Sequence, residues 1–164
     1  MSERPLWAPW RIQYITGPKG DECVFCAAAA GSDDHAAHVI ERGARCLTLL
    51  NAFPYTPGHV MVAPLRHLAS LEQLADDELL ELMRMARNAV GALRQAMSPA
   101  GYNVGLNLGT VAGAGIADHL HLHVVPRWQG DTSFMPLLSD TYVIPQALEA
   151  TRDVLVQALG RMRS

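Results

Sequence analysis

The stretch His119-Leu120-His121-Leu122-His123-Val124-Val125 carries the strongest pattern in this chain of 164 residues. Histidine alternates with an apolar residue, and such alternation indicates a β-strand, because successive side chains of a strand point to opposite faces. The three histidines therefore share one face of the expected strand. At ~3.3 Å per residue, neighbouring imidazoles lie roughly 6.6 Å apart and can reach one phosphate or one metal ion. A solvent-exposed polar face or an incidental metal site would show the same alternation.

The sequence that leads into this strand is rich in small residues. It runs from Asn107 to Asp118 and contains Gly113, Gly115 and Ile116. Small residues let backbone N–H groups approach a phosphate closely. The stretch lacks the spacing and the lysine of a P-loop, and it lacks the spacing of a dinucleotide fingerprint. Next to the histidine strand, it indicates a phosphate held against an imidazole nucleophile.

Apolar patterning and turn residues predict short strands and two helices along the chain. A long helix covers Asp76–Met97, and a final helix begins near Pro145. The expected strands are His38–Glu41, Arg45–Asn51, His59–Pro64, Tyr102–Leu108 and His119–Pro126. Because helices are inserted between hairpins, the predicted fold class is α+β with a mainly antiparallel five-stranded sheet, not a doubly wound parallel one.

We expect a single domain over residues 1–164, in which residues 1–22 form an irregular arm packed on the core through Trp7, Trp10 and Tyr14. In the long helix, Asp76 is the expected cap. Helical spacing predicts a buried face in each helix, and alternation predicts one apolar face in the fourth strand. The residues on these faces are Leu79, Leu80, Met83, Ala86, Val90 and Leu93, then Leu148, Thr151, Leu155 and Leu159, then Val104, Leu106 and Leu108.

Composition excludes several classes of function. The net charge is −3 and there is no run of Lys or Arg, which argues against nucleic acid as a partner. No apolar run approaches the roughly 18 residues of a membrane span, so no membrane partner is expected. The N-terminus shows no signal-peptide pattern, and we expect a cytoplasmic protein. The three cysteines are too few and odd in number for a disulfide scaffold, and metal or redox chemistry is favoured.

The histidine stretch matches the HφHφHφφ signature, with φ apolar, of the histidine triad superfamily of nucleotidyl hydrolases and transferases, which this chain resembles over nearly its whole length. Leu49–Leu74 is similar to the central hairpin of that family, and Gly101–Gly109 to the next strand. WAPWRIQYI, HVVPRWQGDTSFMPLL and VIPQAL resemble the bacterial diadenosine tetraphosphate phosphorylase-like branch. The expected fold is therefore HIT-like, and the family implies a homodimer joined across its two sheets.

The resemblance implies a role for each matching residue. His121 is the nucleophile that attacks the α-phosphorus of a nucleotide, and neutral imidazole suits this role because it attacks and leaves readily near pH 7. His123 orients the phosphate and handles protons at the leaving group. His119, the first histidine of the triad, and His59 line the same site. Asn107 matches a phosphate-side amide, and Asn51 stands where the family places an acidic residue that holds ribose hydroxyls. A strand-start or turn position would also explain His59 and Asn107.

The pair Cys23-Val-Phe-Cys26 has the spacing of half a zinc site. In zinc-bearing relatives the other two ligands match His67 and His119, which would make the zinc structural. A local set of Cys23, Cys26, His35 and His38 is the competing ligand set, and a reduced CxxC without metal is a third reading. Cys46 is expected to be a small buried apolar residue.

The resemblance implies an enzyme that cleaves diadenosine polyphosphates, with a nucleotide or dinucleoside polyphosphate as substrate, inorganic phosphate as one acceptor, and no organic cofactor. His123 stands where phosphorylases and transferases of the superfamily often have Gln and hydrolases usually have His. The bacterial phosphorylase-like branch can also carry His, so this position leaves water and phosphate both open as acceptors. The alternatives are a hydrolase of another nucleoside phosphate or phosphoramidate, a non-catalytic nucleotide-binding module, and a zinc-dependent redox or structural protein. Arg127, Trp128 and Asp131 follow the strand and either contact a nucleotide or pack a surface turn.

Overall fold

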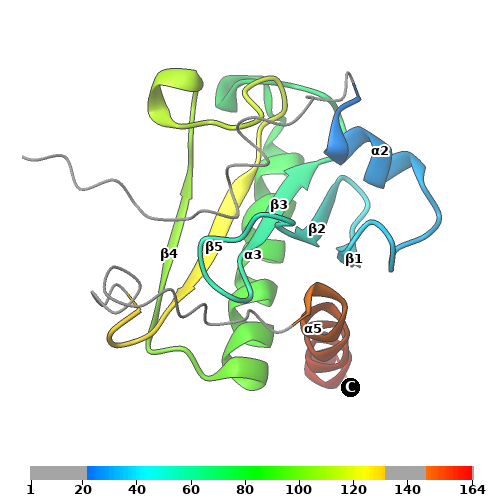
Figure 1. Cartoon of the computed structure of the whole chain (residues 1–164). Coiled ribbons are helices and arrows are strands. Elements are labelled where there is room, and N and C mark those ends of the chain that lie inside the picture. Colours follow the sequence, from blue (N-terminus) through cyan, green and yellow to red (C-terminus); the bar gives the residue numbers. More distant parts are fainter. Residues whose placement is uncertain (1–21, 132–146, 164) are drawn as a thin grey trace, which may run out of the picture.

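The computed structural model describes residues 22–131 and 147–163, so the predicted arm lies outside the described residues except for Glu22. Its centre is an antiparallel sheet of five strands in the order β1-β2-β3-β5-β4 (Figure 1). The strands are β1 (Val39–Arg42), β2 (Cys46–Leu50), β3 (Val60–Pro64), β4 (Gly101–Leu106) and β5 (Leu122–Arg127). The helices are α2 (Val24–Ala30), α3 (Asp76–Met97) and α5 (Leu148–Arg163), with short 3-10 helices at Leu71–Gln73 and Thr110–Ala112. The predicted α+β class is confirmed.

Helices cover both faces of the sheet, which explains why β2 and β3 are buried at every position. α3 and α5 pack on one face, against a cluster that includes Cys46, Leu50, Val60, Val62, Leu122 and Val124. α2 packs on the other face through Phe25 and Ala28, against Leu47, Leu49, Met61 and Ala63. His123 pairs with Met61 and so lies on the α2 face. The alternation predicted for the histidine strand holds within β5.

α3 has the predicted bounds, but its cap and its buried face differ from the prediction. Ala75 is the N-cap, and its backbone N–H donates to Oε2 of Glu78 at 2.9 Å, so Asp76 is not the cap. Leu79, Leu80 and Met83 are 42%, 69% and 51% exposed, which corrects the predicted core stripe. The predicted Ala86 and Leu93 are buried and Val90 is partly buried against the cluster, while Leu82, Met85, Ala89 and Ala92 take the remaining core positions.

Two buried glutamates explain why the buried face of α3 differs from the face that apolar spacing predicts. Glu81 accepts hydrogen bonds from the backbone N–H groups of Ala44, Arg45 and Cys46, and Glu78 pairs with Arg66 through two bonds of 2.7 Å. A carboxylate that receives several donors is stable when buried, so these acidic residues occupy the face that apolar spacing alone assigns to leucine.

β5 begins at Leu122, so His119 and His121 lie in the segment that leads into it rather than in the predicted strand. The ladder with β3 stops there because neighbouring polar groups have other partners. The backbone N–H of Leu120 donates to the Leu68 carbonyl at 2.7 Å, and the Pro64 carbonyl lies 2.9 Å from Nε2 of His119. The segment before β5 is thus tied to the chain that follows β3.

The edges of the sheet differ in how they are covered. α5 runs beside β1, and Nε of Arg152 donates to the Val39 carbonyl at 2.9 Å. In α5 the predicted buried residues Thr151, Leu155 and Leu159 are confirmed, whereas the predicted start near Pro145 lies outside the described residues. β4 is the other edge. Its Val104 is 48% exposed, as is Leu108 just beyond it at 47%. The predicted apolar face of this strand is therefore only partly buried.

None of the helices in the described part of the chain has the length and apolarity needed to cross a membrane.

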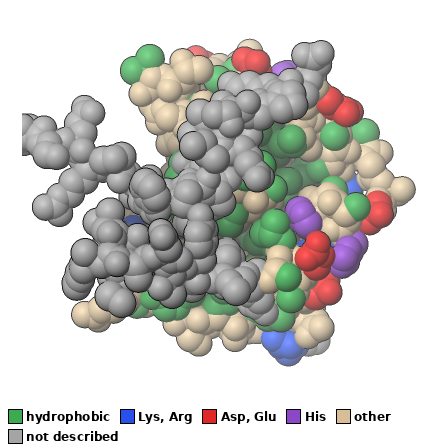
Figure 2. All heavy atoms as spheres, in the orientation of Figure 1, with side chains coloured by type: hydrophobic (Ala, Val, Ile, Leu, Met, Phe, Trp, Pro, Cys, Tyr) green, Lys and Arg blue, Asp and Glu red, His purple; other side chains and the backbone are tan. Residues whose placement is uncertain are grey.

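Histidine and acidic side chains gather on one flank of the face in Figure 2, over the segment that links α2 to β1. This segment contains Asp33, Asp34 and His35, and Asp34 forms an ion pair with Arg42.

Candidate active site and metal centre

Three of the predicted site histidines form one cluster on the α2 face of the sheet. Nε2 of His59, at the start of β3, lies 2.9 Å from Nδ1 of His123 in β5. The rings of His121 and His123 meet edge to face with centroids 4.7 Å apart. His59 is completely buried and His121 is 6% exposed, while His123 is only partly buried. The cluster therefore combines two shielded imidazoles with one that is more accessible.

The hydrogen bonds of His59 fix which of its ring nitrogens carries the proton. The backbone N–H of Tyr55 donates to Nδ1 of His59 at 3.2 Å, so this nitrogen is an acceptor. The proton of neutral His59 then lies on Nε2, which donates to Nδ1 of His123. A neutral His123 consequently carries its own proton on Nε2. The main chain at Tyr55 thus leaves Nε2–H of a neutral His123 as a hydrogen-bond donor.

His121 has the opposite arrangement. Its Nδ1 lies 2.8 Å from the carbonyl oxygen of His119, and only a protonated Nδ1 can donate to that oxygen. Nε2 of neutral His121 therefore holds a lone pair. Burial lowers the pKa of His121, with the His119 carbonyl opposing this effect, so the ring favours the neutral form near pH 7. A neutral imidazole with a lone pair at Nε2 is a nucleophile.

The turn between β2 and β3 holds His59 in place. Gly58 has a φ of +80°, and a Cβ built there would lie 2.7 Å from Sδ of Met97 and 2.9 Å from Cδ2 of Leu93. Only glycine fits this close approach to α3 without strain. Tyr55 stacks on the His59 ring with centroids 5.1 Å apart and an interplanar angle of 16°. The fold therefore positions His59 through both backbone and ring contacts.

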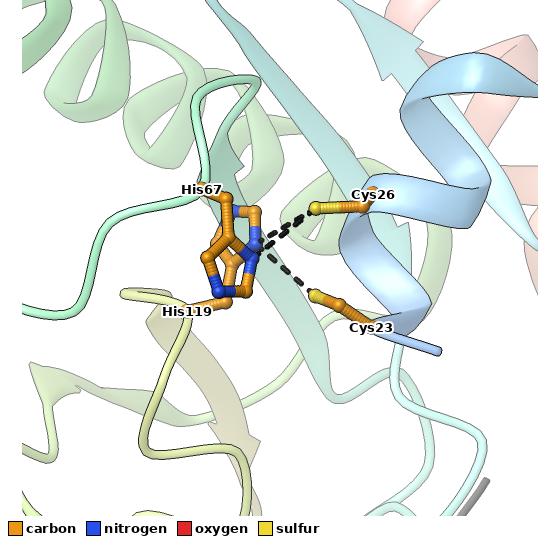
Figure 3. A group of neighbouring side chains, drawn as sticks. All are labelled: Cys23, Cys26, His67 and His119. Carbon is orange, nitrogen blue, oxygen red and sulfur yellow. Dashed lines mark hydrogen bonds between the residues drawn. The ribbon is translucent and has the colours of Figure 1, made fainter. Parts of the chain in front are cut away.

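A second group of side chains lies next to the cluster. Cys23 and Cys26 at the start of α2 face His67, which follows β3, and His119, which precedes β5 (Figure 3). Their ligand atoms all lie within 4.8 Å of one another. Sγ of Cys23 is 3.2 Å from Nδ1 of His119, and Sγ of Cys26 is 3.3 Å from Nδ1 of His67.

These residues fit a tetrahedral zinc ion. Zn–S bonds of about 2.3 Å and Zn–N bonds of about 2.0–2.1 Å place tetrahedral ligand atoms roughly 3.3–3.8 Å apart, close to the three S···N contacts of 3.2, 3.3 and 3.6 Å in this group. Nε2 of His119 lies 2.9 Å from the Pro64 carbonyl, which favours a proton on Nε2 and leaves Nδ1 free to bind a metal. Burial lowers the pKa of His119, which also favours the neutral ligand form.

Comparison with known proteins places this geometry in a family. Residues 33–130, which include all three triad histidines, match the HIT domain. The chain belongs to the HIT family. It is 40% identical to an AP-4-A phosphorylase of Mycobacterium tuberculosis over 164 aligned residues, which cover 95% of this chain and 84% of that protein. It is 29% identical to the adenosine 5'-monophosphoramidase of Schizosaccharomyces pombe over 105 residues, 64% of this chain and 74% of that protein.

HIT proteins of known structure share the fold. A Zn-bound histidine triad family protein from Mycobacterium smegmatis superposes with a TM-score of 0.70 and 28% identity, covering 87% of this chain and 96% of that one. The predicted resemblance to the phosphorylase-like branch of the HIT superfamily is confirmed.

The competing local ligand set is not brought together. Within the described residues, the Cys/His group close enough to share an ion consists of Cys23, Cys26, His67 and His119, without His35 or His38. His38 has a φ of +53°, and its buried Nδ1 has no hydrogen-bond partner in the described structure. His119 in turn has both ring nitrogens occupied, by Cys23 and by the Pro64 carbonyl. It therefore faces the metal group.

The other predicted nucleotide-binding residues occupy two places. Oδ1 of Asn51 accepts the Phe53 N–H at 2.8 Å, and its Nδ2 lies 3.4 Å from Nδ1 of His59, so the amide borders the histidine cluster. Asn107 lies in the loop that joins β4 to β5, where its Nδ2 donates to the Gly113 carbonyl at 3.4 Å.

The small-residue loop is open to solvent. Gly113 and Gly115 are exposed, and Gly113 has a φ of +89°, while Ile116 packs against the apolar cluster under α2. Arg127 pairs with Asp131 and donates to Oδ1 of Asn103, which favours the surface-turn reading of this segment.

Sequence reasoning missed two aromatic residues of the site. Tyr55 stacks on His59, and Phe25 packs against His119 and His121. Both occupy positions within quoted motifs, one shortly before the Pro-Gly-His sequence and one inside the CxxC pair. Their aromatic character was the available signal, but the contact partners depend on how the strands pair.

Proposed function

We propose that this protein transfers a nucleotidyl group from a diadenosine polyphosphate, with diadenosine tetraphosphate as the substrate, through a covalent intermediate on His121. The observation that carries the proposal is the contrast in the partners of Nδ1: a carbonyl oxygen for His121 and a ring nitrogen of His59 for His123. His121 offers a lone pair at Nε2, because its Nδ1 donates to the His119 carbonyl. His123 offers a proton at Nε2, because its Nδ1 accepts from His59.

These two groups fit the two halves of a displacement at phosphorus. Nε2 of His121 forms a bond to the α-phosphorus while the bond from that phosphorus to the bridging oxygen breaks. Nε2–H of His123 donates a hydrogen bond to the departing polyphosphate oxygen and stabilises its negative charge, so ATP leaves as an anion. From diadenosine tetraphosphate this step releases ATP and leaves AMP on His121.

The second step returns His121 to its starting form. Inorganic phosphate attacks the phosphorus, the N–P bond breaks, and the product is ADP; if water attacks, the product is AMP. Phosphate attacks as an anion and needs no base, and Nε2–H of His123 donates a hydrogen bond to an oxygen at the reacting phosphorus; if water attacks, its proton passes to solvent. The 40% identity to the AP-4-A phosphorylase of Mycobacterium tuberculosis supports phosphate as the acceptor.

Zinc is part of the same proposal. Cys23, Cys26, His67 and His119 would hold it with four protein ligands and no open position, so the ion would join α2 to the segments beside β3 and β5 without binding substrate. The support is the spacing of the ligand atoms and the similarity to the Zn-bound protein of Mycobacterium smegmatis.

We also infer that the site works in a single domain that forms a homodimer through β4. β4 is an edge strand with no further strand beside it among the described residues, and its Val104 is exposed. An edge of this kind can add a strand from a second copy. Asn51, Asn107 and the loop with Gly113, Gly115 and Ile116 would bind the nucleotide beside the histidines.

Incubation with diadenosine tetraphosphate and labelled inorganic phosphate tests the function. We expect labelled ADP and unlabelled ATP in equal amounts. AMP in the place of ADP, without incorporation of label, would assign the protein as a hydrolase. A parallel incubation with adenosine 5'-monophosphoramidate tests the second HIT activity. Binding of nucleotides without turnover of any of them would contradict the proposal.

A further inference from the structure

Phe25 lies where the metal group and the catalytic cluster meet. It is the residue before Cys26 and two after Cys23, and it is completely buried. Its ring centroid is 5.0 Å from that of His119 and 4.9 Å from that of His121, with interplanar angles of 48° and 33°. Both distances are within the range of direct aromatic contact. One ring thus contacts a proposed metal ligand and the proposed nucleophile.

Within residues 22–131 and 147–163, three contacts bear on the orientation of the His121 ring. Nδ1 donates to the His119 carbonyl, the ring edge meets His123, and the Phe25 ring packs against it. Rotation about the Cβ–Cγ bond would break the hydrogen bond and move Nε2 away from the substrate. The flat face of Phe25 opposes this rotation, because a tilted imidazole would collide with it.

Phe25 is itself anchored by its neighbours in sequence. Cys23 and Cys26 lie on either side of it, and their sulfur atoms face His119 and His67. An ion that binds these four side chains would therefore fix the backbone on both sides of Phe25, together with the imidazole of His119 on which its ring packs.

We propose that Phe25 is a positioning residue for His121, and that the metal group at Cys23, Cys26, His67 and His119 acts on the nucleophile through it. The metal group then does more than hold α2 to the sheet: it restricts the rotation of the imidazole that attacks phosphorus. The activity part of this inference rests on the proposed function, whereas the orientation of His121 does not.

The alternative is that Phe25 only fills the apolar cluster under α2. A matched pair of substitutions separates the two roles. Phe25→Leu and Leu47→Ala remove the same number of carbon atoms from two completely buried side chains of that cluster. Both leave a similar void, but only the first removes the ring against His121. Leucine at position 25 keeps most of the apolar contacts, so the variant retains the fold.

The test measures the His121 imidazole directly, by nitrogen NMR of histidine-labelled, zinc-loaded protein at one pH, with signals assigned from a His121→Asn variant. In the unmodified chain and in Leu47→Ala we expect a single ring form with the proton on Nδ1. In Phe25→Leu we expect exchange between the two tautomers of His121, because a rotated ring loses the hydrogen bond that holds the proton on Nδ1. kcat should fall on the order of 10-fold with an unchanged Kd for AMP, since orientation and not binding is lost. Treatment of the unmodified protein with a chelator should give the same His121 signals as Phe25→Leu.

Each outcome has a distinct meaning. If His121 gives the same signals in Phe25→Leu as in Leu47→Ala, and kcat is equal in both, Phe25 is only a core residue and the inference is overturned. If chelation leaves the His121 signals unaltered, the link to the metal group is refuted. If the ring form changes as expected but the unmodified protein turns over no nucleotide, the positioning role stands and the proposed function fails.

Discussion

Nε2 of His59 lies 2.9 Å from Nδ1 of His123, although the two residues are 64 positions apart in the chain. The contact joins the start of β3 to β5, the two strands that pair next to the site. Since Tyr55 N–H occupies the other nitrogen of His59, the contact has one direction, with His59 as donor. The pairing of β3 with β5 therefore determines which ring nitrogen of a neutral His123 carries the proton.

Replacement of His121 tests the nucleophile. His121→Ala should lower kcat/KM for diadenosine tetraphosphate by on the order of 10³-fold or more, because no group remains to form the bond to phosphorus. His121→Asn should lower it equally while the thermal midpoint stays near that of the unmodified protein. Product analysis by chromatography, together with a rapid acid or base quench, measures both. An adduct on any residue other than His121, or more than about a tenth of the activity in His121→Ala, would exclude the mechanism.

The pair His59 and His123 should act as one unit. His123→Ala should reduce kcat on the order of 10²-fold, because the hydrogen-bond donor to the departing oxygen is lost. His59→Asn should also reduce kcat, since His123 loses the donor that sets its proton on Nε2. In the His123→Ala background, however, His59→Asn should have almost no further effect. A double-mutant cycle on kcat checks this, and additive losses would show that His59 acts independently of His123.

The ligand set can be tested without any activity. His67→Ala should abolish stoichiometric zinc in elemental analysis of freshly purified protein, while His35→Ala should leave it unchanged, because His35 lies outside the group of four. Chelation should lower the thermal midpoint by on the order of 5–10 °C, since the ion binds only the folded chain. Less than about 0.2 zinc per chain, with no change on chelation, would contradict a zinc site.

Glu78 should make stability depend on pH in acid. The hydrogen bond from Arg66, followed by that from the Ala75 N–H, lowers the pKa of Glu78 from 4.5 to about 2 in the folded protein. Between these values the unfolded chain binds the proton more readily, so stability is full above pH 4.5 and falls as the pH drops toward 2. In Glu78→Gln this loss should be smaller. Urea midpoints at pH 6, 4 and 3 for both proteins measure the difference, and parallel curves would refute the assignment.

Cys46 should be inert toward alkylation. Burial, together with the negative charges of Glu81 and Glu78, raises its pKa to about 12, so almost no thiolate is present at pH 8. After chelation, iodoacetamide should modify Cys23 and Cys26 but leave Cys46 unmodified until the protein is unfolded. Mass spectrometry of digested protein locates the labels. Rapid labelling of Cys46 in the folded protein would disprove its burial.

The sequence was sufficient for the features that depend on local patterns. Alternation predicted β5, and helical spacing with Pro99 and Gly101 predicted the bounds of α3. The orientation of α3 was not predictable from apolar spacing, because Glu81 is buried by backbone donors at residues 44–46. Likewise, no local pattern shows that the backbone N–H of Leu120 donates to the Leu68 carbonyl, so that β5 begins at Leu122 and not at His119.

For the site as well, local sequence patterns were predictable and contacts between distant segments were not. The CxxC pair and the triad are local signals, but the choice of His67 over His35 came from the family resemblance, since the strand pairing that brings His67 to the cysteines cannot be derived from spacing. The short helix α2 was absent from the sequence prediction, although Ala27–Ala30 favours a helix. The contacts of Phe25 with His119 and His121, and of Tyr55 with His59, could not be predicted, because they depend on how α2, β3 and β5 come together in the folded chain.

The four-residue metal group also has a consequence for the order of folding. Cys26 and His67 are 41 positions apart, and Cys23 and His119 are 96 apart. Contacts between such distant positions require the intervening loops to close, so we expect the four ligands to come together only after β3 and β5 have paired. An ion captured at this late stage stabilises the native state more than the transition state. Its effect should therefore appear as slower unfolding, with the rate of folding almost unchanged.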